Sequence, residues 1–342
     1  MEWRQLHVSS ANTVLLAYRG LKQLPRNILS DNVTNLDASH NLLEAVPHWI
    51  DRLTRLEHVN LSNNKLMMLP SEFGMLDHIT VLKLTNNQLS DLSLPKELAA
   101  MVMLRELYLA GNEFQSIPPQ IFELRQLRTL QMGKNKITEI PRDIVKLKKL
   151  NLLYLGGNQL TEVPAELGQL SWLQSLSLSD NSITRLPQQL KQLTRLQSLS
   201  LHNNQLQLLP KEIIELTSLT ELSLRGNPLV VRFVRKMSNN VPTLLELSGR
   251  CIKKCSLHYN RSIIPASLVY YLNHARTCDN PLCAGVYFTS RVQCVKFVDF
   301  CGKYRVPLLQ YLCSDTCSEG CDHELTSSSD DENRMVKKVL LG

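Results

Sequence analysis

Aliphatic and polar residues alternate in short segments that recur along most of the chain. One of them, residues 150–158, reads Leu-Asn-Leu-Leu-Tyr-Leu-Gly-Gly-Asn, with leucines at alternating positions before an asparagine. Because successive side chains of a strand point to opposite faces, the pattern predicts a short strand with an inward apolar face. Nine asparagines close these segments: Asn41, Asn64, Asn87, Asn112, Asn135, Asn158, Asn181, Asn204 and Asn227.

The asparagines stand 23 residues apart, except for one step of 25 residues between Asn87 and Asn112. The form L-x-x-L-x-L-x-x-N at this period is typical of a leucine-rich repeat. One unit cannot bury its leucine row alone, so stacked units share a single apolar core. We therefore expect an α/β fold, a horseshoe-shaped leucine-rich repeat solenoid. Each asparagine amide is expected to pair backbone groups where its strand turns, which makes all nine structural.

The rest of each unit predicts the convex side. A proline and an amphipathic stretch follow the asparagine, as in residues 140–147. Proline is tolerated at a helix start, so short helices or 3₁₀ turns are expected there. Val14, Leu16 and Leu21 indicate a degenerate first unit, with Arg19 at the asparagine position. Terminal units are usually atypical because one of their faces meets water.

The repeat pattern stops after Asn227, which indicates further domains. A helix beginning near Pro242 would place Leu244, Leu247, Cys251 and Cys255 on one face. We expect this face to seal the leucine core and to bury both thiols, with metal ligation as the alternative. The expected organisation is an N-terminal cap at 1–22, repeats at 23–230, a helical C-terminal cap at 231–262, a cysteine-rich docking module at 263–322 and a disordered tail at 323–342.

The outward strand positions predict a binding surface on the concave side. Tyrosine and arginine carry much of the binding energy at protein interfaces, and both occur at these positions. The alternative is that these side chains only stack on one another along the ladder. The sequence shows no phosphate-binding glycine loop, nucleophile elbow or H-E-x-x-H pattern, so we expect a non-enzymatic interaction protein. The expected partner-binding residues are Arg105, Tyr108, Arg128, Gln131, Leu152 and Tyr154.

Composition narrows the class of partner. The net charge of +7 comes from basic residues on several faces, without a nucleic-acid-binding motif. We expect a protein partner rather than a nucleic acid. No long apolar run and no signal peptide occur, which predicts a cytoplasmic protein, with the nucleus as an alternative, and no membrane contact. In a reducing compartment, nine cysteines indicate metal binding or buried thiols rather than disulfides.

Two cysteine pairs carry candidate metal chemistry. Cys278 and Cys283 form C-x4-C, and Cys313 and Cys317 form C-x3-C. Two such pairs supply the four ligands that tetrahedral structural zinc requires. Either of two later residues, Cys321 or His323, could replace one ligand. The alternative is a set of buried thiols beneath three aromatic side chains, Phe288, Phe297 and Phe300.

The acidic tail contains candidate phosphorylation sites. Ser327, Ser328 and Ser329 each have an acidic residue three positions later, which suits an acidophilic kinase. Such patterns also arise by chance in acidic tails. We expect modification at these three serines.

Residues 222–235, 297–314 and 338–342, and the run 264–272 followed by paired cysteines, carry a family resemblance. They resemble intracellular leucine-rich repeat proteins that end in a cysteine-rich module. Some members of that group are substrate receptors of cullin–RING ubiquitin ligases. The resemblance implies a substrate on the concave face and a ligase, through elongin, on the cysteine-rich module. The alternative is a signalling scaffold of the Ras or phosphatase type without ligase contact.

Ligase docking would use a helix that begins with an L-x-x-x-C box. Leu309, Leu312 and Cys313 have that spacing, and these are the expected docking residues. Leu268 and Leu272 offer a second version, in which leucine replaces the cysteine. Cys313 is thus a candidate for two different roles, zinc ligand and docking anchor.

Overall fold

The computed structural model describes residues 8–10, 12–26, 31–229, 242–280, 283–300, 304–314, 317 and 338–340. The chain forms two compact units. Unit 1 comprises Met1–Leu206, Glu212–Asn227 and Val336–Gly342, and unit 2 comprises Gln207–Lys211 and Pro228–Met335. Among the described residues, no helix combines the length and hydrophobicity needed to cross a bilayer.

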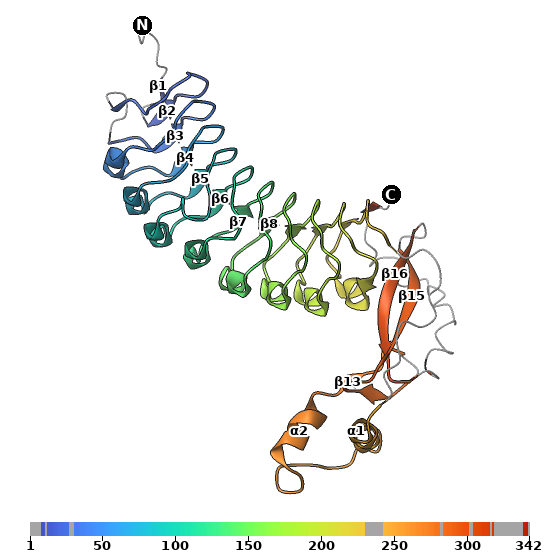
Figure 1. The fold of residues 1–342 in the computed structure, drawn as a ribbon. Coiled ribbons are helices and arrows are strands. Elements are labelled where there is room, and N and C mark those ends of the chain that lie inside the picture. Colours follow the sequence, from blue (N-terminus) through green and yellow to red (C-terminus); the bar gives the residue numbers. More distant parts are fainter. Residues whose placement is uncertain are drawn as a thin grey trace. The chain divides into compact units, whose positions relative to one another are not determined.

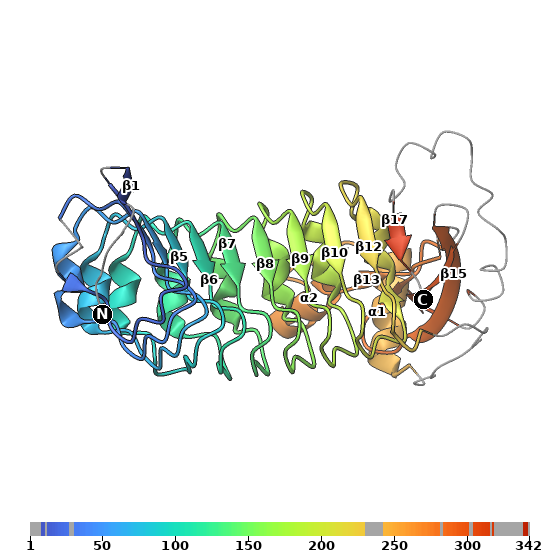
Figure 2. The same ribbon diagram turned by 90° about the horizontal axis from the view of Figure 1, so that it is seen from above.

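Unit 1 is built on one sheet in the strand order β1 to β10, β12, β17 (Figure 2). Neighbouring strands are parallel and in register, except that β1 pairs antiparallel with β2. The strands are β1 (Val8–Ser10), β2 (Thr13–Leu15), β3 (Asn35–Asp37), β4 (His58–Asn60), β5 (Val81–Lys83), β6 (Glu106–Tyr108), β7 (Thr129–Gln131), β8 (Leu152–Tyr154), β9 (Ser175–Ser177), β10 (Ser198–Ser200), β12 (Glu221–Ser223) and β17 (Lys338–Leu340).

Short 3₁₀ helices follow the strands on the convex side of unit 1 (Figure 1). Most begin directly after the expected proline, as η6 does after Pro141. They are η2 (His48–Arg52), η3 (Ser71–Met75), η4 (Lys96–Ala100), η5 (Pro119–Glu123), η6 (Arg142–Lys146), η7 (Ala165–Gln169), η8 (Gln188–Gln192) and η9 (Lys211–Glu215). The predicted leucine-rich repeat solenoid is confirmed.

The asparagine ladder pairs backbone groups between neighbouring units. Asn158 Nδ2 donates to the carbonyl oxygens of Met132 at 3.0 Å and Leu155 at 2.9 Å. Asn158 Oδ1 accepts from the Ile137 N–H at 3.0 Å. The Ile137 N–H, which would otherwise be buried without a partner, is thereby satisfied, and each carbonyl oxygen accepts from two successive ladder asparagines. The structural role expected for these asparagines is confirmed.

The first unit of the stack works without an asparagine of its own. Val14, Leu16 and Leu21 are buried, as the degenerate pattern predicted. The Arg19 N–H donates to Asn41 Oδ1 of the next unit at 3.0 Å. The asparagine of the second unit therefore accepts the hydrogen bond of the first, and β1 covers the edge of β2.

The far edge of this sheet is covered by β17. Leu222 of β12 lies opposite Val339 of β17 in a parallel pairing. The prediction of disorder throughout residues 323–342 is therefore wrong for residues 338–340. A strand of three residues has no periodicity of its own to reveal it, and its partner β12 is distant in the chain.

The described residues of unit 2 include the helices α1 and α2 and small sheets. Strands β15 (Val292–Phe300) and β16 (Tyr304–Leu312) form an antiparallel pair, and β11 (Leu209–Pro210) adds to β16 in parallel. Strands β13 (Arg276–Thr277) and β14 (Val286–Tyr287) form a second antiparallel pair. The helices are α1 (Leu244–Lys254) and α2 (Ala266–Asn273).

Helix α1 forms near the expected start, with Thr243 Oγ1 accepting from the Glu246 N–H at 3.2 Å. Its predicted buried face is wrong. Leu244 and Leu247 are 83 % and 47 % exposed, and two further members of that face, Cys251 and Cys255, are exposed thiols. The helix buries Glu246 and Gly249 instead, and it belongs to unit 2.

The predicted docking helix at residues 309–313 is also wrong. Leu309 and Leu312 lie in β16, where Leu309 is opposite Val295 and Leu312 opposite Val292 of β15. Leu312 is fully buried. Backbone pairing with β15 holds this segment extended, so its leucines cannot share one helical face. The second version, Leu268 with Leu272, does lie on a helix, α2.

Candidate functional site

The expected partner-binding residues share the concave face of unit 1. Tyr108, Gln131 and Tyr154 are cross-strand neighbours on β6, β7 and β8. Leu152 lies on the same face of β8, two residues before Tyr154. Arg105 and Arg128 precede β6 and β7, are exposed, and are adjacent through a 2.7 Å bond from the Arg128 N–H to the Arg105 carbonyl. The structure thus brings these six residues together.

Tyr108 is held by charged neighbours. Its hydroxyl donates to Glu106 Oε2 at 2.7 Å, and Lys83 Nζ lies 5.4 Å from the centre of its ring. Burial, followed by the hydrogen bond to the Glu106 carboxylate, raises the pKa of Tyr108 to about 12. The phenol therefore stays neutral and presents a half-buried ring on the concave face.

Tyr154 lies against glycines of its own and the preceding unit. A Cβ atom on Gly133 would be 2.0 Å from Tyr154 Cε1, and one on Gly156 would be 3.2 Å from its Cζ. The ring therefore occupies space that any other residue at position 133 would fill. Tyr154 is half-buried, which restricts its motion before a partner arrives.

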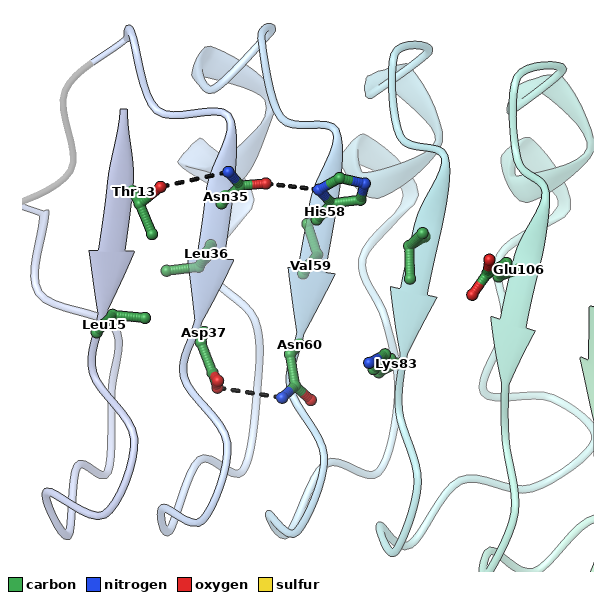
Figure 3. A pocket seen from close by; sticks show the side chains of 11 residues that line it. Thr13, Leu15, Asn35, Leu36, Asp37, His58, Val59, Asn60, Lys83 and Glu106 are labelled. Carbon is green, nitrogen blue, oxygen red and sulfur yellow. Dashed lines mark hydrogen bonds between the residues drawn. The ribbon is translucent and has the colours of Figure 1, made fainter. Parts of the chain in front are cut away.

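A hollow of about 380 Å³ lies on the concave face over β2 to β6 (Figure 3). None of the six expected partner-binding residues lines it. Glu106 borders both the hollow and Tyr108, so the two regions adjoin. The hollow is lined by Thr13, Leu15, Asn35, Leu36, Asp37, His58, Val59, Asn60, Val81, Lys83 and Glu106.

Hydrogen bonds across strands organise the polar side chains of the hollow (Figure 3). Asn35 Nδ2 donates to Thr13 Oγ1 at 3.3 Å, and Asn35 Oδ1 lies 2.6 Å from His58 Nδ1. Asn60 Nδ2 donates to Asp37 Oδ1 at 3.2 Å. Because these side chains already bond to one another, less conformational entropy remains to be lost on binding.

Sequence reasoning did not select the hollow. The outward positions of the repeat include Asp37, Asn60 and Lys83. These residues are not tyrosine or arginine, the residue types that mark a protein interface most strongly. His58 and Asn35 occupy the outward position two residues earlier. The available signal was the repeat register, which places both rows on the concave face.

The four expected cysteines converge in unit 2. The Sγ atoms of Cys278, Cys283, Cys313 and Cys317 all lie within 4.8 Å of one another. Cys283 Sγ is 3.6 Å from Cys313 Sγ, and Cys317 Sγ is 3.4 Å from Cys283 Sγ. The candidate replacements Cys321 and His323 lie outside the described residues, as do Ser327, Ser328 and Ser329.

A buried carboxylate organises the loop beside this cluster. Glu246 is fully buried, accepts from the N–H groups of Phe288 and Ser290 at 3.1 and 2.7 Å, and pairs with Arg250 at 2.6 Å. Burial alone would raise the pKa of Glu246, but these hydrogen bonds outweigh it and lower the pKa to about 2. Phe288 stacks on Tyr271 of α2 with ring centres 4.3 Å apart.

Comparisons with known proteins agree with the repeat architecture. A leucine-rich repeat region model matches residues 78–180, and two further leucine-rich repeat models match residues 171–229 and 55–76. The solved structure of a leucine-rich repeat protein of Leptospira interrogans aligns with this chain with a TM-score of 0.54 and 34 % sequence identity. The alignment covers 64 % of this chain and 68 % of that one. The chain belongs to the leucine-rich repeat proteins.

Two more proteins are informative. The chain is 51 % identical to leucine-rich repeat-containing protein 58 of Xenopus laevis over 121 residues, which are 34 % of this chain and 35 % of that protein. The match thus spans about a third of the length of the first curated relatives. The second is a receptor-kinase ectodomain of Arabidopsis thaliana, solved in complex with Casparian strip integrity factor 2. Its sequence is 34 % identical to this chain, and its structure aligns with a TM-score of 0.55 over 64 % of this chain and 27 % of that one.

Proposed function

We propose that this protein is a non-enzymatic adaptor that binds a protein substrate on the concave face of unit 1 and a second protein on unit 2. The hollow of about 380 Å³, which adjoins Tyr108 through Glu106, carries the proposal, and the row from Tyr108 to Tyr154 extends the surface from there. Half-buried aromatic anchors next to a concavity are the usual centre of a protein interface. The plant receptor of similar fold, solved with Casparian strip integrity factor 2, supports a protein ligand.

The chemistry of the hollow suits a polar protein segment with an apolar side chain. Asp37 and Glu106 supply carboxylates, Lys83 supplies an ammonium group, and Leu15 is an outward apolar residue that is 42 % exposed. Repeat solenoids commonly use such extended concave faces for binding. The substrate would thus contact β2 to β8, with its most buried groups between the hollow and Tyr154.

The most concrete form of this adaptor is a substrate receptor of an elongin-type cullin–RING ubiquitin ligase. The resemblance of the cysteine-rich module to such receptors supports it. Large exposed apolar side chains, which often mark interaction sites, also support it. Since residues 309–313 form no helix, α1 and α2 become the proposed docking elements. Their exposed apolar side chains, with those of the connecting turn, are Leu244, Leu245, Leu247, Leu257, Ile263 and Tyr270.

The substrate surface is tested with full-length protein purified from cells. In a Tyr108→Ala/Tyr154→Ala variant, the amount of the proteins that co-purify with the wild type should fall at least tenfold. Quantitative mass spectrometry measures these amounts. A Glu139→Ala/Lys148→Ala variant changes two exposed residues outside the concave strands and should retain them. Retention of every partner by the double tyrosine variant would contradict the proposed surface.

The ligase surface is tested in the same preparations. Wild-type protein should carry elongin and a cullin, and Leu247→Glu should lose both while keeping the substrate set. Arg261→Glu, an exposed position between α1 and α2, serves as the control. If wild-type protein binds its substrate set without elongin or cullin under mild conditions, the ligase role is rejected and the scaffold alternative remains.

A further inference from the structure

We propose that Cys278, Cys283, Cys313 and Cys317 bind one structural zinc ion in unit 2. Four thiolates about 2.3 Å from a zinc ion form a tetrahedron with edges of roughly 3.8 Å. The Sγ separations of 3.6 Å for Cys283–Cys313, 3.5 Å for Cys313–Cys317 and 3.4 Å for Cys317–Cys283 are close to that edge. The fourth atom, Cys278 Sγ, lies within 4.8 Å of all three.

The same distances argue against a disulfide. A disulfide brings one pair of sulfurs to about 2.0 Å and leaves other cysteines apart. Here three sulfurs are nearly equidistant from one another, so no pair is singled out. An equal spacing of several thiols is the arrangement that a single central cation requires. Four sulfur ligands at tetrahedral positions select zinc or iron, and zinc needs no redox partner.

Hydrogen-bond donors surround the sulfurs. The Cys313 N–H donates to Cys278 Sγ at 3.3 Å, and the Gly285 N–H donates to Cys283 Sγ at 3.3 Å. Ser314 Oγ lies 3.2 Å from Cys317 Sγ, within reach of its hydroxyl hydrogen. A zinc ion with four thiolates has a net charge of −2, and such donors stabilise thiolate charge.

Gly285 leaves room for the sulfurs. A Cβ atom at this position would be 2.6 Å from Cys313 Sγ and 3.0 Å from Cys283 Sγ. The backbone of residue 285 therefore approaches the cluster more closely than any residue with a side chain could. This close approach is what brings its N–H within bonding distance of Cys283 Sγ.

The ion would stabilise a region with little apolar core. Cys278 follows β13, Cys283 precedes β14 and Cys313 follows β16, so one ion would tie these strand ends together. The buried apolar cluster at these strand ends contains Cys278, Val292, Cys294 and Leu312, so half of its members are cysteines. Small cores usually need a metal or disulfides.

The binding step is an exchange of protons for metal. Four thiols lose four protons to solvent and form four Zn–S bonds, with no change in the oxidation state of sulfur. Four protein ligands leave no open position for substrate or water, so the ion is structural rather than catalytic. The site does not depend on which proteins bind either unit.

Metal analysis of the full chain tests the proposal. Protein purified under reducing conditions, without a chelator or a histidine tag, should contain one zinc per chain by elemental analysis and by native mass spectrometry. Cys283→Ser should contain well under one, and Cys255→Ser, an exposed thiol outside the cluster, should retain one. Wild-type protein that stays well below one zinc after incubation with zinc overturns the proposal, as does equal loss in both variants.

Cobalt substitution covers the case in which Cys283→Ser fails to fold. Metal-free wild-type protein should take up one Co²⁺ with the visible absorption of tetrahedral cobalt and thiolate-to-cobalt charge transfer, and zinc should displace it. Gly285→Ala keeps all four ligands and should bind cobalt at least tenfold more weakly, because its Cβ meets two of the sulfurs. Cobalt binding without thiolate charge transfer in the wild type would overturn the proposal.

Discussion

The ring of Tyr154 lies directly over the backbone of Gly133. A Cβ atom on Gly133 would come within 2.0 Å of Tyr154 Cε1 and within 2.8 Å of the Gly156 carbonyl oxygen. Ala110 stands at the corresponding position one unit earlier, so the repeat backbone itself accepts a side chain there. Gly133 is required because Tyr154 and Gly156 of the next unit fill the space of a side chain. It therefore determines where the ring of Tyr154, a proposed binding residue, lies.

Gly133→Ala should therefore displace Tyr154. Overpacking of this kind costs about 1–3 kcal/mol, and we expect partner binding to fall as far as it does in Tyr154→Ala. Ala110→Ser is the matched control and should change neither property. Urea denaturation and a pull-down measure the two effects. Unchanged binding in Gly133→Ala would show that the position of the Tyr154 ring is irrelevant to the partner.

Asn158→Ala should weaken the solenoid. The change removes the acceptor of the Ile137 N–H, and a buried backbone group left unpaired costs about 1–3 kcal/mol. The carbonyl oxygens of Met132 and Leu155 keep a hydrogen bond from the neighbouring ladder asparagines. We expect a lower urea midpoint by circular dichroism and faster hydrogen exchange in the units on both sides. Gln159→Ala, at the exposed neighbouring position, should leave both unchanged. Equal effects of the two variants would contradict the structural role.

Unit 2 should lose stability in acid through Glu246. The folded pKa of Glu246 is about 2, below the value of about 4.3 in an unfolded chain. The ionised Glu246 contributes about 3 kcal/mol to the free energy of unfolding. This contribution is complete above about pH 4.3 and disappears as the pH falls toward 2. Glu246→Gln should remove this acid dependence. Hydrogen exchange of residues 286–290, corrected for intrinsic rates, measures it, and an unchanged pH profile in the variant would contradict the assignment.

Leu312→Ala should destabilise unit 2 rather than abolish a docking contact alone. Leu312 is fully buried beside Cys278, Val292 and Cys294, and removing a buried leucine costs about 2–5 kcal/mol. Leu309→Ala, at a partly exposed position, should cost less. Hydrogen exchange of β15 and β16 distinguishes the two. A Leu312→Ala protein that is fully stable yet fails to bind elongin would restore the docking box.

Val339→Pro should uncover the edge of β12. Proline lacks the N–H group needed for strand pairing, so β17 would separate from β12. We expect faster hydrogen exchange at residues 221–223 and more self-association, because an unpaired strand edge recruits other chains. Exchange at β3 is an internal control and should not change. Unaltered exchange at residues 221–223 would show that β17 does not protect this edge.

Part of the candidate site could be predicted because repeat positions are local information. The asparagine register places Tyr108, Gln131 and Tyr154 on one face, and the structure confirms that row. The hollow beside it depends on how the outward side chains of neighbouring strands bond to one another. His58 with Asn35 and Asp37 with Asn60 form such contacts across units, and no single unit contains both partners.

Helix α1 shows why a local pattern can mislead. Its leucines and cysteines recur at helical spacing, which predicted a buried apolar face. The structure buries Glu246 because its carboxylate binds the backbone of residues 288–290, far away in the chain. The same holds for residues 309–313, where pairing with β15 decides between strand and helix.

The sequence by itself determined the repeat fold, the structural asparagines, the outward rows and the set of four cysteines. All of these depend on spacing within one or two units, or on residue type. Only the tertiary structure decided the place of the hollow, the exposed face of α1, the strand at residues 338–340 and the convergence of the cysteines. Each of these arises from contacts between residues distant in the chain, which short-range periodicity does not encode.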